Sequence, residues 1–296
     1  MPATDPPTLP FYTQPGAMTS AGRHTAALRA LPTDPAALAE IIQGLLIHEH
    51  LADAYGVTLT DDERASVHTR PAERLLDQVL ARDGRPLDVA REPAARLAGN
   101  CRHFTVLLVT MLRAHGIPAR ARCGFGAYFR AGAFEDHWAG EYWNAGLRRW
   151  VLVDAQIDAV QYKLFRLDLD VTDVPRDQFL IAGDAWARFR AGTADPDRFG
   201  LSVINETGDW WIAANLMRDA AALGNIELLP WDDWGAMPGP GVPIGDDRCA
   251  LFDRLAALTQ DPDRRFDELL HLTHADRRLR VPPTVRNALR DRDEPI

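Results

Sequence analysis

A cysteine, a histidine and an aspartate follow one another along the chain, each in a distinct local context. Cys101 comes after Gly-Asn, His137 stands between Asp and Trp, and Asp154 ends the run Val-Leu-Val-Asp. A thiol, an imidazole and a carboxylate in this order are typical of a nucleophile, its base and the group that orients the base. The sequence therefore indicates chemistry that begins with attack of a thiolate on a carbonyl carbon.

The run after Cys101 predicts a buried helix. It is apolar almost all round, through Phe104, Val106, Leu107, Leu108, Val109, Met111 and Leu112. Gly116 and Pro118 then end it, as a left-handed cap and a helix breaker do. We expect Cys101 at the N-terminus of this helix, where unpaired backbone N–H groups and the helix dipole favour a thiolate.

His137 and Asp154 lie in two segments that predict strands, 136–143 and 150–154, both rich in aromatic and β-branched residues. The connection 144–149 contains the asparagine and glycine of a hairpin turn. In a hairpin with an even-length loop, residues whose numbers differ by an odd amount share a face, and these two differ by 17. We therefore expect the imidazole and the carboxylate on one face, directly or nearly opposite each other.

This arrangement resembles the transglutaminase-like superfamily of the bacterial type. The resemblance covers about residues 70–165 and is carried by Gly99 to Phe104, the helix ending His115 to Arg120, the strand Ala121 to Tyr128, Asp136-His137-Trp138, and Trp150 to Asp154. It implies an α+β, papain-like core in which a buried helix packs on an antiparallel sheet. It also implies acyl transfer through a thioester intermediate, with Cys101, His137 and Asp154 as the catalytic triad.

Three parts of the chain are predicted. Residues 1–32 form an N-terminal surface segment, 33–170 a transglutaminase-like catalytic core, and 171–296 a mostly helical C-terminal extension packed on the core. N-terminal helices of the core begin at Asp34-Pro35 and near Pro71. In the extension, helices are expected near 184–191, 209–223, 247–259 and 263–272, the second of them capped by Asp209.

Residues that flank the triad are candidates for stabilising an oxyanion or positioning a substrate. They are Asn100, His103, Trp138 and Gln156. The backbone N–H of Cys101 is expected to be one oxyanion donor, because it lies at the helix start. Asn100 is more simply interpreted as the N-cap of that helix.

Metal-binding patterns are absent from the sequence. His-Glu-His at 48–50 lacks the second histidine that a metalloprotease helix requires, since position 52 is Ala52, and is interpreted as a solvated or partly buried helical face. His271 and His274 have no accompanying cysteine or carboxylate cluster. The three cysteines show neither metal-binding spacing nor a disulfide framework. We therefore expect no metal and no organic cofactor.

Composition limits the partners. A hydrophobic share of 46% and a charged share of 25% are typical of a soluble globular protein. The net charge of −9 argues against a nucleic-acid partner, because that binding rests on neutralising phosphates. No stretch approaches the roughly 18 apolar residues that span a bilayer, and the N-terminus has no secretory signal. We expect no membrane partner and a cytoplasmic location.

Three classes of function fit these patterns: an amide-forming acyltransferase or amidase, a cysteine peptidase, and a catalytically inactive binding protein on the same fold. The substrate would be a peptide, a protein or a small acyl compound, with an amine acceptor in the case of transfer. A hydrolase gives the thioester to water, whereas a transferase excludes water and admits an amine. The aromatic-rich stretch from Trp210 to Trp234 slightly favours a covered, water-poor cleft, and hence transfer, but apolar cleft walls also suit a hydrolase, so the sequence does not decide between them.

Overall fold

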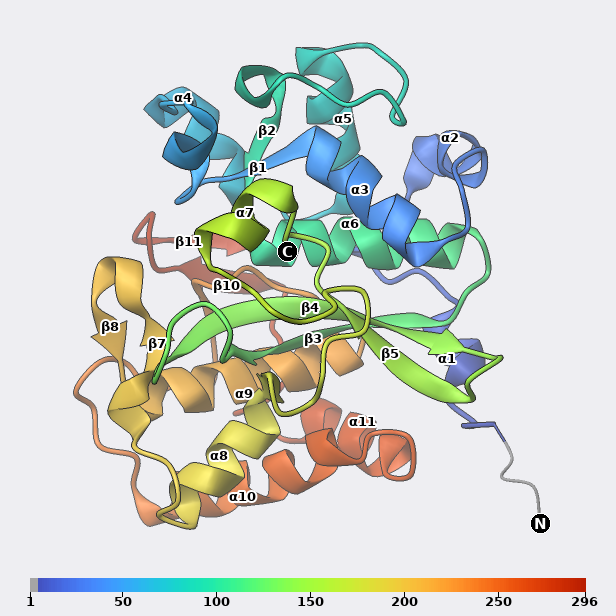
Figure 1. The fold of residues 1–296 in the computed structure, drawn as a ribbon. Helices are drawn as coiled ribbons and strands as arrows, with labels where there is room; N and C mark the ends of the chain where they lie inside the picture. Colours follow the sequence, from blue (N-terminus) through green and yellow to red (C-terminus); the bar gives the residue numbers. More distant parts are fainter. Residues whose placement is uncertain (1–4) are drawn as a thin grey trace. The chain divides into compact units, whose positions relative to one another are not determined.

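The computed structural model describes residues 5–296 (Figure 1). Its chain divides into two compact units. We name them after the predicted chemical groups that they hold. The thiol unit contains Cys101 and comprises residues 9–121 and 138–175; the imidazole unit contains His137 and comprises residues 5–8, 122–137 and 176–296. Strands β3 (Ala119–Gly126) and β4 (Phe134–Asn144) each contribute residues to both units. The predicted boundaries at 33 and 171 stay predictions.

The thiol unit is built around α6 (Cys101–Ala114), in which every residue from Cys101 to Arg113 is buried, as predicted. The helix α3 (Pro35–Leu45) packs along α6 (Figure 1). It begins after Asp34, whose carboxylate accepts a hydrogen bond from the N–H of Ala37 at 2.9 Å. The second predicted N-terminal helix is α5 (Ala72–Arg82). Both helix predictions are confirmed.

Shorter elements complete this unit. They are the helices α1 (Leu9–Tyr12), α2 (Thr25–Arg29), α4 (Asp61–Arg64) and α7 (Ala159–Leu164), and the strands β1 (Leu46–His48), β2 (Leu97–Gly99) and β5 (Arg149–Val153). Of the predicted surface segment 1–32, the first four residues lie outside the described chain. Its side chains Tyr12, Met18 and Leu28 are buried. Residues 9–32 therefore contribute to the core of this unit as well as to its surface.

The larger sheet has the strand order β6 (Phe179–Ile181), β3, β4, β7 (Phe199–Leu201) and β8 (Glu206–Thr207), with β5 also paired to β4. The pairs β3–β6, β4–β5 and β7–β8 are antiparallel, whereas β4–β7 is parallel. The sheet is thus mixed, and the expectation of an antiparallel sheet is corrected at this pair. On β4, a Cβ added to Gly140 would lie 2.9 Å from Cδ2 of Leu108, so a glycine there lets α6 approach the strand closely.

The predicted hairpin is confirmed by β4 and β5. Its register pairs Gly140 with Val153 and Asn144 with Arg149. The connection 145–148 therefore has an even length, which the parity argument requires. The ladder ends at Gly140 and Val153, before residue 137 on one strand and residue 154 on the other. The facing of those two side chains stays a prediction.

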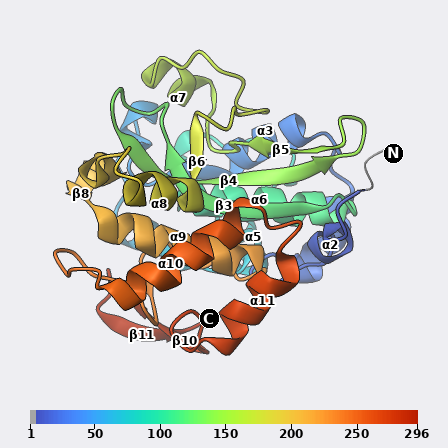
Figure 2. The same cartoon turned by 90° about the horizontal axis from the view of Figure 1, so that it is seen from below.

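The imidazole unit is dominated by four helices, α8 (Ala182–Arg190), α9 (Asp209–Leu223), α10 (Asp246–Gln260) and α11 (Phe266–Ala275), all four close to their predicted ranges. Figure 2 shows α9 beside α8 and α10, which pack against it. This packing explains why α9 is buried from Trp211 to Leu223. Its N-cap is Gly208 and Asp209 is its first residue, which corrects the predicted cap. A small sheet of β9 (Asp232–Asp233), β10 (Thr284–Asn287) and β11 (Arg292–Pro295) completes the unit.

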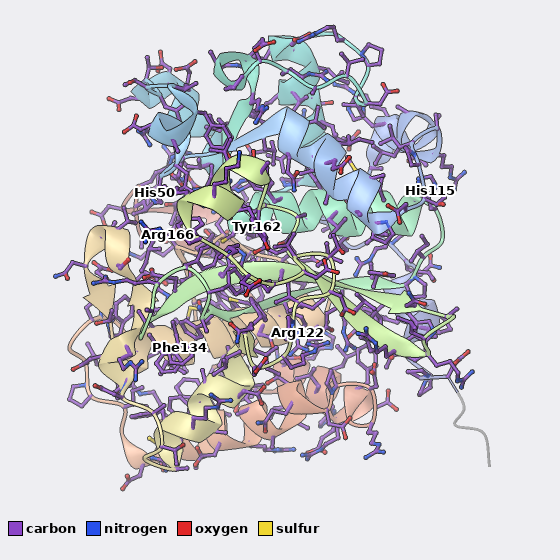
Figure 3. The ribbon with its side chains drawn as sticks, viewed as in Figure 1. His50, His115, Arg122, Phe134, Tyr162 and Arg166 are labelled. Carbon is purple, nitrogen blue, oxygen red and sulfur yellow. The ribbon has the colours of Figure 1, made fainter. Side chains whose placement is uncertain are left out.

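Two buried arginines on β3 each pair with a carboxylate of their own unit. In the thiol unit, Nε of Arg120 donates to Oε2 of Glu141 at 2.6 Å, and the guanidinium lies 4.0 Å from the ring centre of Trp150. In the imidazole unit, Arg122 (Figure 3) forms a bidentate ion pair with Asp219, in which Nε donates to Oδ1 at 2.9 Å and Nη2 to Oδ2 at 2.7 Å. Such pairs satisfy charges that would otherwise be costly to bury.

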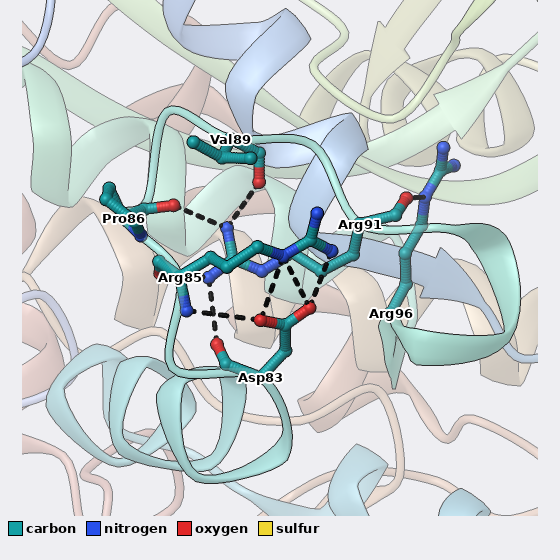
Figure 4. A network of polar contacts seen from close by, with 6 residues as sticks. All are labelled: Asp83, Arg85, Pro86, Val89, Arg91 and Arg96. Carbon is teal, nitrogen blue, oxygen red and sulfur yellow. Dashed lines mark hydrogen bonds and ion pairs between the residues drawn. The ribbon is translucent and has the colours of Figure 1, made fainter.

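The loop that leads to β2 is fixed by Arg91 (Figure 4). One terminal nitrogen donates to the carbonyl groups of Pro86 and Val89 at 2.7 and 2.5 Å, and the other donates to those of Asp83 and Arg85 at 3.0 and 2.6 Å. Arg91 is only 2% exposed. A single buried guanidinium thus ties together four backbone carbonyl groups of the loop between α5 and β2.

Candidate active site

Cys101 is the first residue of α6 and is only 6% exposed. Asn100 precedes it with an extended backbone (φ −132°, ψ 179°) and forms a capping box with His103 at the third helical position. The N-cap prediction for Asn100 is therefore confirmed. At this position the first-turn N–H groups and the helix dipole favour an anion on the sulfur.

His103 serves the helix start. Its Nδ1 lies 3.2 Å from the backbone nitrogen of Asn100, which donates to it, and its Nε2 lies 3.1 Å from the carbonyl oxygen of Thr69. Burial, followed by the charge of Arg102, holds the pKa of this imidazole well below its usual range. Nδ1 also lies 2.8 Å from Oδ1 of Asn100, so both the backbone and the side chain of Asn100 contact this nitrogen. Both nitrogens are engaged, so the structure gives His103 a role in the cap.

Asp154 follows β5 and is buried. Its Oδ1 accepts a hydrogen bond from the backbone N–H of Gln156 at 3.1 Å. The segment that carries it is held to α3, because Nε2 of Gln43 donates to the carbonyl groups of Ala155 and Ile157 at 3.2 and 3.1 Å. The carboxylate is thus placed by a short loop whose backbone is itself anchored.

The side chain of Gln156 is committed as a donor. Its Nε2 donates to Oε1 of Gln161 at 2.9 Å, and Nε2 of Gln161 donates to the hydroxyl of Tyr55 at 3.0 Å. Oε1 of Gln156 has no partner among residues 5–296, so the atom of this amide that is left for a ligand is an acceptor. Trp138 differs, because its buried Nε1–H has no acceptor within the described chain. Of these two candidates, Trp138 is the one with a donor left for an oxyanion.

His137 lies among aromatic rings of the imidazole unit. The ring centre of Phe129 is 4.7 Å from that of the imidazole, and those of Tyr128 and Phe179 are 6.1 and 6.2 Å away. The histidine is almost fully buried. Aromatic walls of this kind fix the plane of the ring and exclude water from its faces.

Asp136, the neighbour of His137, is held by residues that the sequence analysis missed. Its Oδ1 accepts a hydrogen bond from Nδ2 of Asn215 at 2.5 Å, and Oδ1 of Asn215 accepts one from Arg218 at 3.2 Å. Burial raises the pKa of Asp136, while Asn215, Arg218 and His137 act in the opposite direction. The available signal was the presence of buried polar side chains, Asn215 and Arg218 among them, in the largely apolar helix α9.

Glu49 is a second residue that sequence reasoning missed. Because β1 and β2 pair in parallel, it lies beside Asn100, and its N–H donates to the carbonyl of Gly99 at 2.8 Å. The helical face predicted for residues 48–50 is wrong, since His48 ends a strand and Glu49 begins a turn. Burial raises the pKa of its carboxyl to about 7, against the lowering effects of the Asn100 amide and of Arg64.

A cavity of about 350 Å³ opens in the thiol unit. Its walls come from α3, the loop after β5, and α7, and Asp154 is among the lining residues. Tyr162 (Figure 3), Ile157 and Val171 give it apolar surface, while Glu40 and Lys163 bring charges of opposite sign. Asp154 thus borders a cavity with room for a small ligand group.

Among residues 5–296, no three His, Cys, Asp or Glu side chains gather as metal ligands would. None of the helices described is long and apolar enough to cross a bilayer.

Comparison with known proteins gives one family and one structural likeness. Residues 68–155 match the model of the transglutaminase-like superfamily. No curated protein matches the chain. Among solved structures, a "putative cysteine protease from Cytophaga hutchinsonii" is similar with a TM-score of 0.35 and 16% identity, over 60% of this chain and 49% of that one. The likeness thus spans about half the length of that protein.

The matched segment holds the whole of the predicted triad. It runs from the turn before α5 through α6, β3, β4 and β5, and it ends one residue after Asp154. Cys101 and His137 lie inside it, at a helix start and in a strand respectively. Residues 68–155 of this α+β chain are accordingly similar to the core of the transglutaminase-like superfamily.

Proposed function

We propose that this protein is a cysteine-dependent enzyme that transfers an acyl group through a thioester on Cys101. The observation that carries the proposal is the position of this thiol, as the first residue of a helix buried along its length, within the family segment. A cysteine that only filled the core would have no need of the helix N-terminus, where an anion is favoured. The inactive binding protein is the reading that this position disfavours.

In the proposed mechanism, the sulfur attacks the acyl carbon while His137 takes the thiol proton. The tetrahedral intermediate collapses, the bond to the leaving amine breaks, and the imidazolium returns the proton to that amine. Asp154 holds the imidazole in the tautomer that accepts at the nitrogen facing sulfur. The backbone N–H of Cys101 and the indole N–H of Trp138 are the proposed oxyanion donors.

The thioester then passes to an amine or to water. Transfer makes the protein an amide-forming acyltransferase, and hydrolysis makes it an amidase or a cysteine peptidase. The cavity at Asp154 supports admission of a small amine, because it has room for one and its lining includes the acidic residues Glu40 and Asp158, which favour a cation. The proposed partners are a peptide, protein or small acyl compound and an amine acceptor, and the proposed location is the cytoplasm.

The test is intact-mass detection of an acyl adduct after incubation with activated esters, thioesters and glutamine peptides. We expect one acyl group per chain on Cys101, lost on addition of an alkylamine with formation of the amide. Loss at the same rate to water alone assigns hydrolysis instead. The variants Cys123→Ser and Cys249→Ser are the controls and should be acylated as the parent is.

Iodoacetamide gives an independent test of the thiol. Cys101 is 6% exposed and Cys249 is 8% exposed, so access alone gives Cys101 no advantage. A thiolate paired with an imidazolium still alkylates at pH values where an ordinary thiol, with a pKa of about 8.5, does not. We therefore expect labelling of Cys101 first at pH 6. Equal labelling of both cysteines would contradict the proposed role.

A further inference from the structure

Glu49 and the residue before the nucleophile are placed together by a strand pair. β1 and β2 run in parallel, with His48 beside Gly99, so the chain leaves both strands at the same end. The N–H of Glu49 donates to the carbonyl of Gly99 at 2.8 Å. The side chains of Glu49 and Asn100 therefore meet one residue before Cys101.

These two buried side chains are in contact, but not all of their polar atoms have hydrogen bonds. Glu49 is 9% exposed and Asn100 is 5% exposed. The amide of Asn100 is close enough to lower the pKa of the carboxyl. Even so, Oε1 of Glu49 and Nδ2 of Asn100 lack a full hydrogen bond to any residue of the described chain. Burying a carboxyl whose oxygen lacks a hydrogen bond costs free energy, so its presence here suggests that the residue has a role.

The charged and titratable neighbours of Glu49 are few. A terminal nitrogen of Arg64 donates to the backbone carbonyl of Glu49 at 2.8 Å. Burial, followed by the charge of that guanidinium, lowers the pKa of His50, whereas the same charge opposes the rise that burial causes in the pKa of Glu49. Nδ1 of His48 accepts a hydrogen bond from the N–H of His50 at 3.3 Å. Asn100 in turn contacts His103, which burial keeps neutral.

We propose that Glu49 is a positioning residue for the nucleophile: its carboxyl orients the Asn100 side chain and thereby sets the cap that places Cys101 at the start of α6. This inference rests on the proposed function of Cys101. It adds a residue that neither the triad nor the capping pattern includes, and it assigns Glu49 no contact with the substrate.

The two protonation states of Glu49 orient the amide in opposite ways. An ionised carboxylate can only accept, so it turns Nδ2 of Asn100 toward itself and leaves Oδ1 for the helix cap. A protonated carboxyl can donate its O–H to Oδ1, which withdraws that oxygen from the cap. The placement of the thiol therefore depends on the charge of Glu49, and this charge changes near neutral pH.

The test is the second-order rate of Cys101 alkylation by iodoacetamide between pH 5 and 9, read by intact mass on the full chain. The parent should show an inflection near pH 7 that is absent from Glu49→Gln, because the amide side chain accepts from Nδ2 at every pH. Glu49→Ala should lower the rate about tenfold across the range, since a lost cap is worth about one power of ten. Glu92→Gln, at an exposed carboxylate, is the matched control and should keep the parent profile.

Two results would overturn the proposal. One is an inflection near pH 7 that persists in Glu49→Gln, and the other is an alanine variant that reacts as fast as the parent. If Glu49→Ala does not fold, the glutamine variant still decides. A failure of the proposed function would look different, because Cys101 of the parent would then not label ahead of Cys123 and Cys249.

Discussion

Cys101 is surrounded by buried polar residues, whereas His137 is surrounded mainly by aromatic side chains. The thiol follows a helix cap, and its neighbours Asn100 and His103 are buried polar groups joined by hydrogen bonds. The imidazole lies among aromatic rings, and its neighbour in sequence is Asp136, whose carboxyl has a pKa raised by burial. The difference suggests a division of labour: hydrogen bonds to the backbone set where the nucleophile lies, while packing sets how the base is turned.

The largest effects should come from the two reacting groups themselves. Cys101→Ala and His137→Ala are each expected to lower kcat by about 10⁶-fold, because both act in the step that makes the thioester bond. Steady-state turnover of the substrate found by acylation checks this, with Cys249→Ser as the control. A His137→Ala enzyme that kept a tenth of the parent activity would mean that the base lies elsewhere.

Asp154→Asn should have the next largest effect, about 10³- to 10⁴-fold in kcat. An amide in place of the carboxylate stabilises the wrong imidazole tautomer without removing the base. The comparison sharpens when Asp136→Asn is measured beside it, because that carboxyl is the nearest one in sequence to His137. The exposed pair member Asp173 offers a control through Asp173→Asn. If Asp136→Asn proves the more damaging of the two, the orienting role passes to Asp136.

Glu49 makes the polar surroundings of the thiol sensitive to pH. Its pKa of about 7 lies above the usual 4.5, so the folded state favours the protonated carboxyl. The resulting stability is fully present below pH 4.5 and is lost as the pH rises through 7. The free energy of unfolding of Glu49→Gln relative to the parent should therefore rise by about 3 kcal/mol between pH 4.5 and 8. Urea unfolding at several pH values measures this, and a constant difference would contradict it.

The same contrast explains what the sequence could reveal. The start of α6, the range of α3 and the range of α9 are written in local signals, namely a cap, a proline or glycine, and a helical spacing of apolar residues. The placement of the thiol depends mainly on such signals, so it could be predicted. The strand hairpin was predictable for the same reason, from its turn residues.

The residues that support the site could not be predicted in this way. Glu49 reaches Asn100 because two three-residue strands pair across 51 positions of sequence, and Asn215 reaches Asp136 across 79. No local pattern encodes either meeting, since both depend on the tertiary fold. The boundary between the units likewise runs through β4, next to His137, where the sequence shows one uninterrupted strand.

Asn215 provides the smallest and most selective test, on the aromatic side of the comparison. Asn215→Leu removes the donor of Asp136 and leaves a buried carboxyl without it, which should cost about 2 kcal/mol of stability at pH 7. The pKa of Asp136 is already raised by burial, so the loss of Asn215 raises it further. A raised carboxyl pKa stabilises the fold at acid pH and loses that effect as the pH rises. The variant should therefore be less impaired at pH 4.5 than at pH 7.5 in urea unfolding. Asp136→Asn combined with Asn215→Leu is the control, because without the titrating group the loss should not vary with pH. If Asn215→Leu alone lowers the free energy of unfolding equally at both pH values, Asn215 acts by packing alone. The carboxyl of Asp136 would then be held by other contacts.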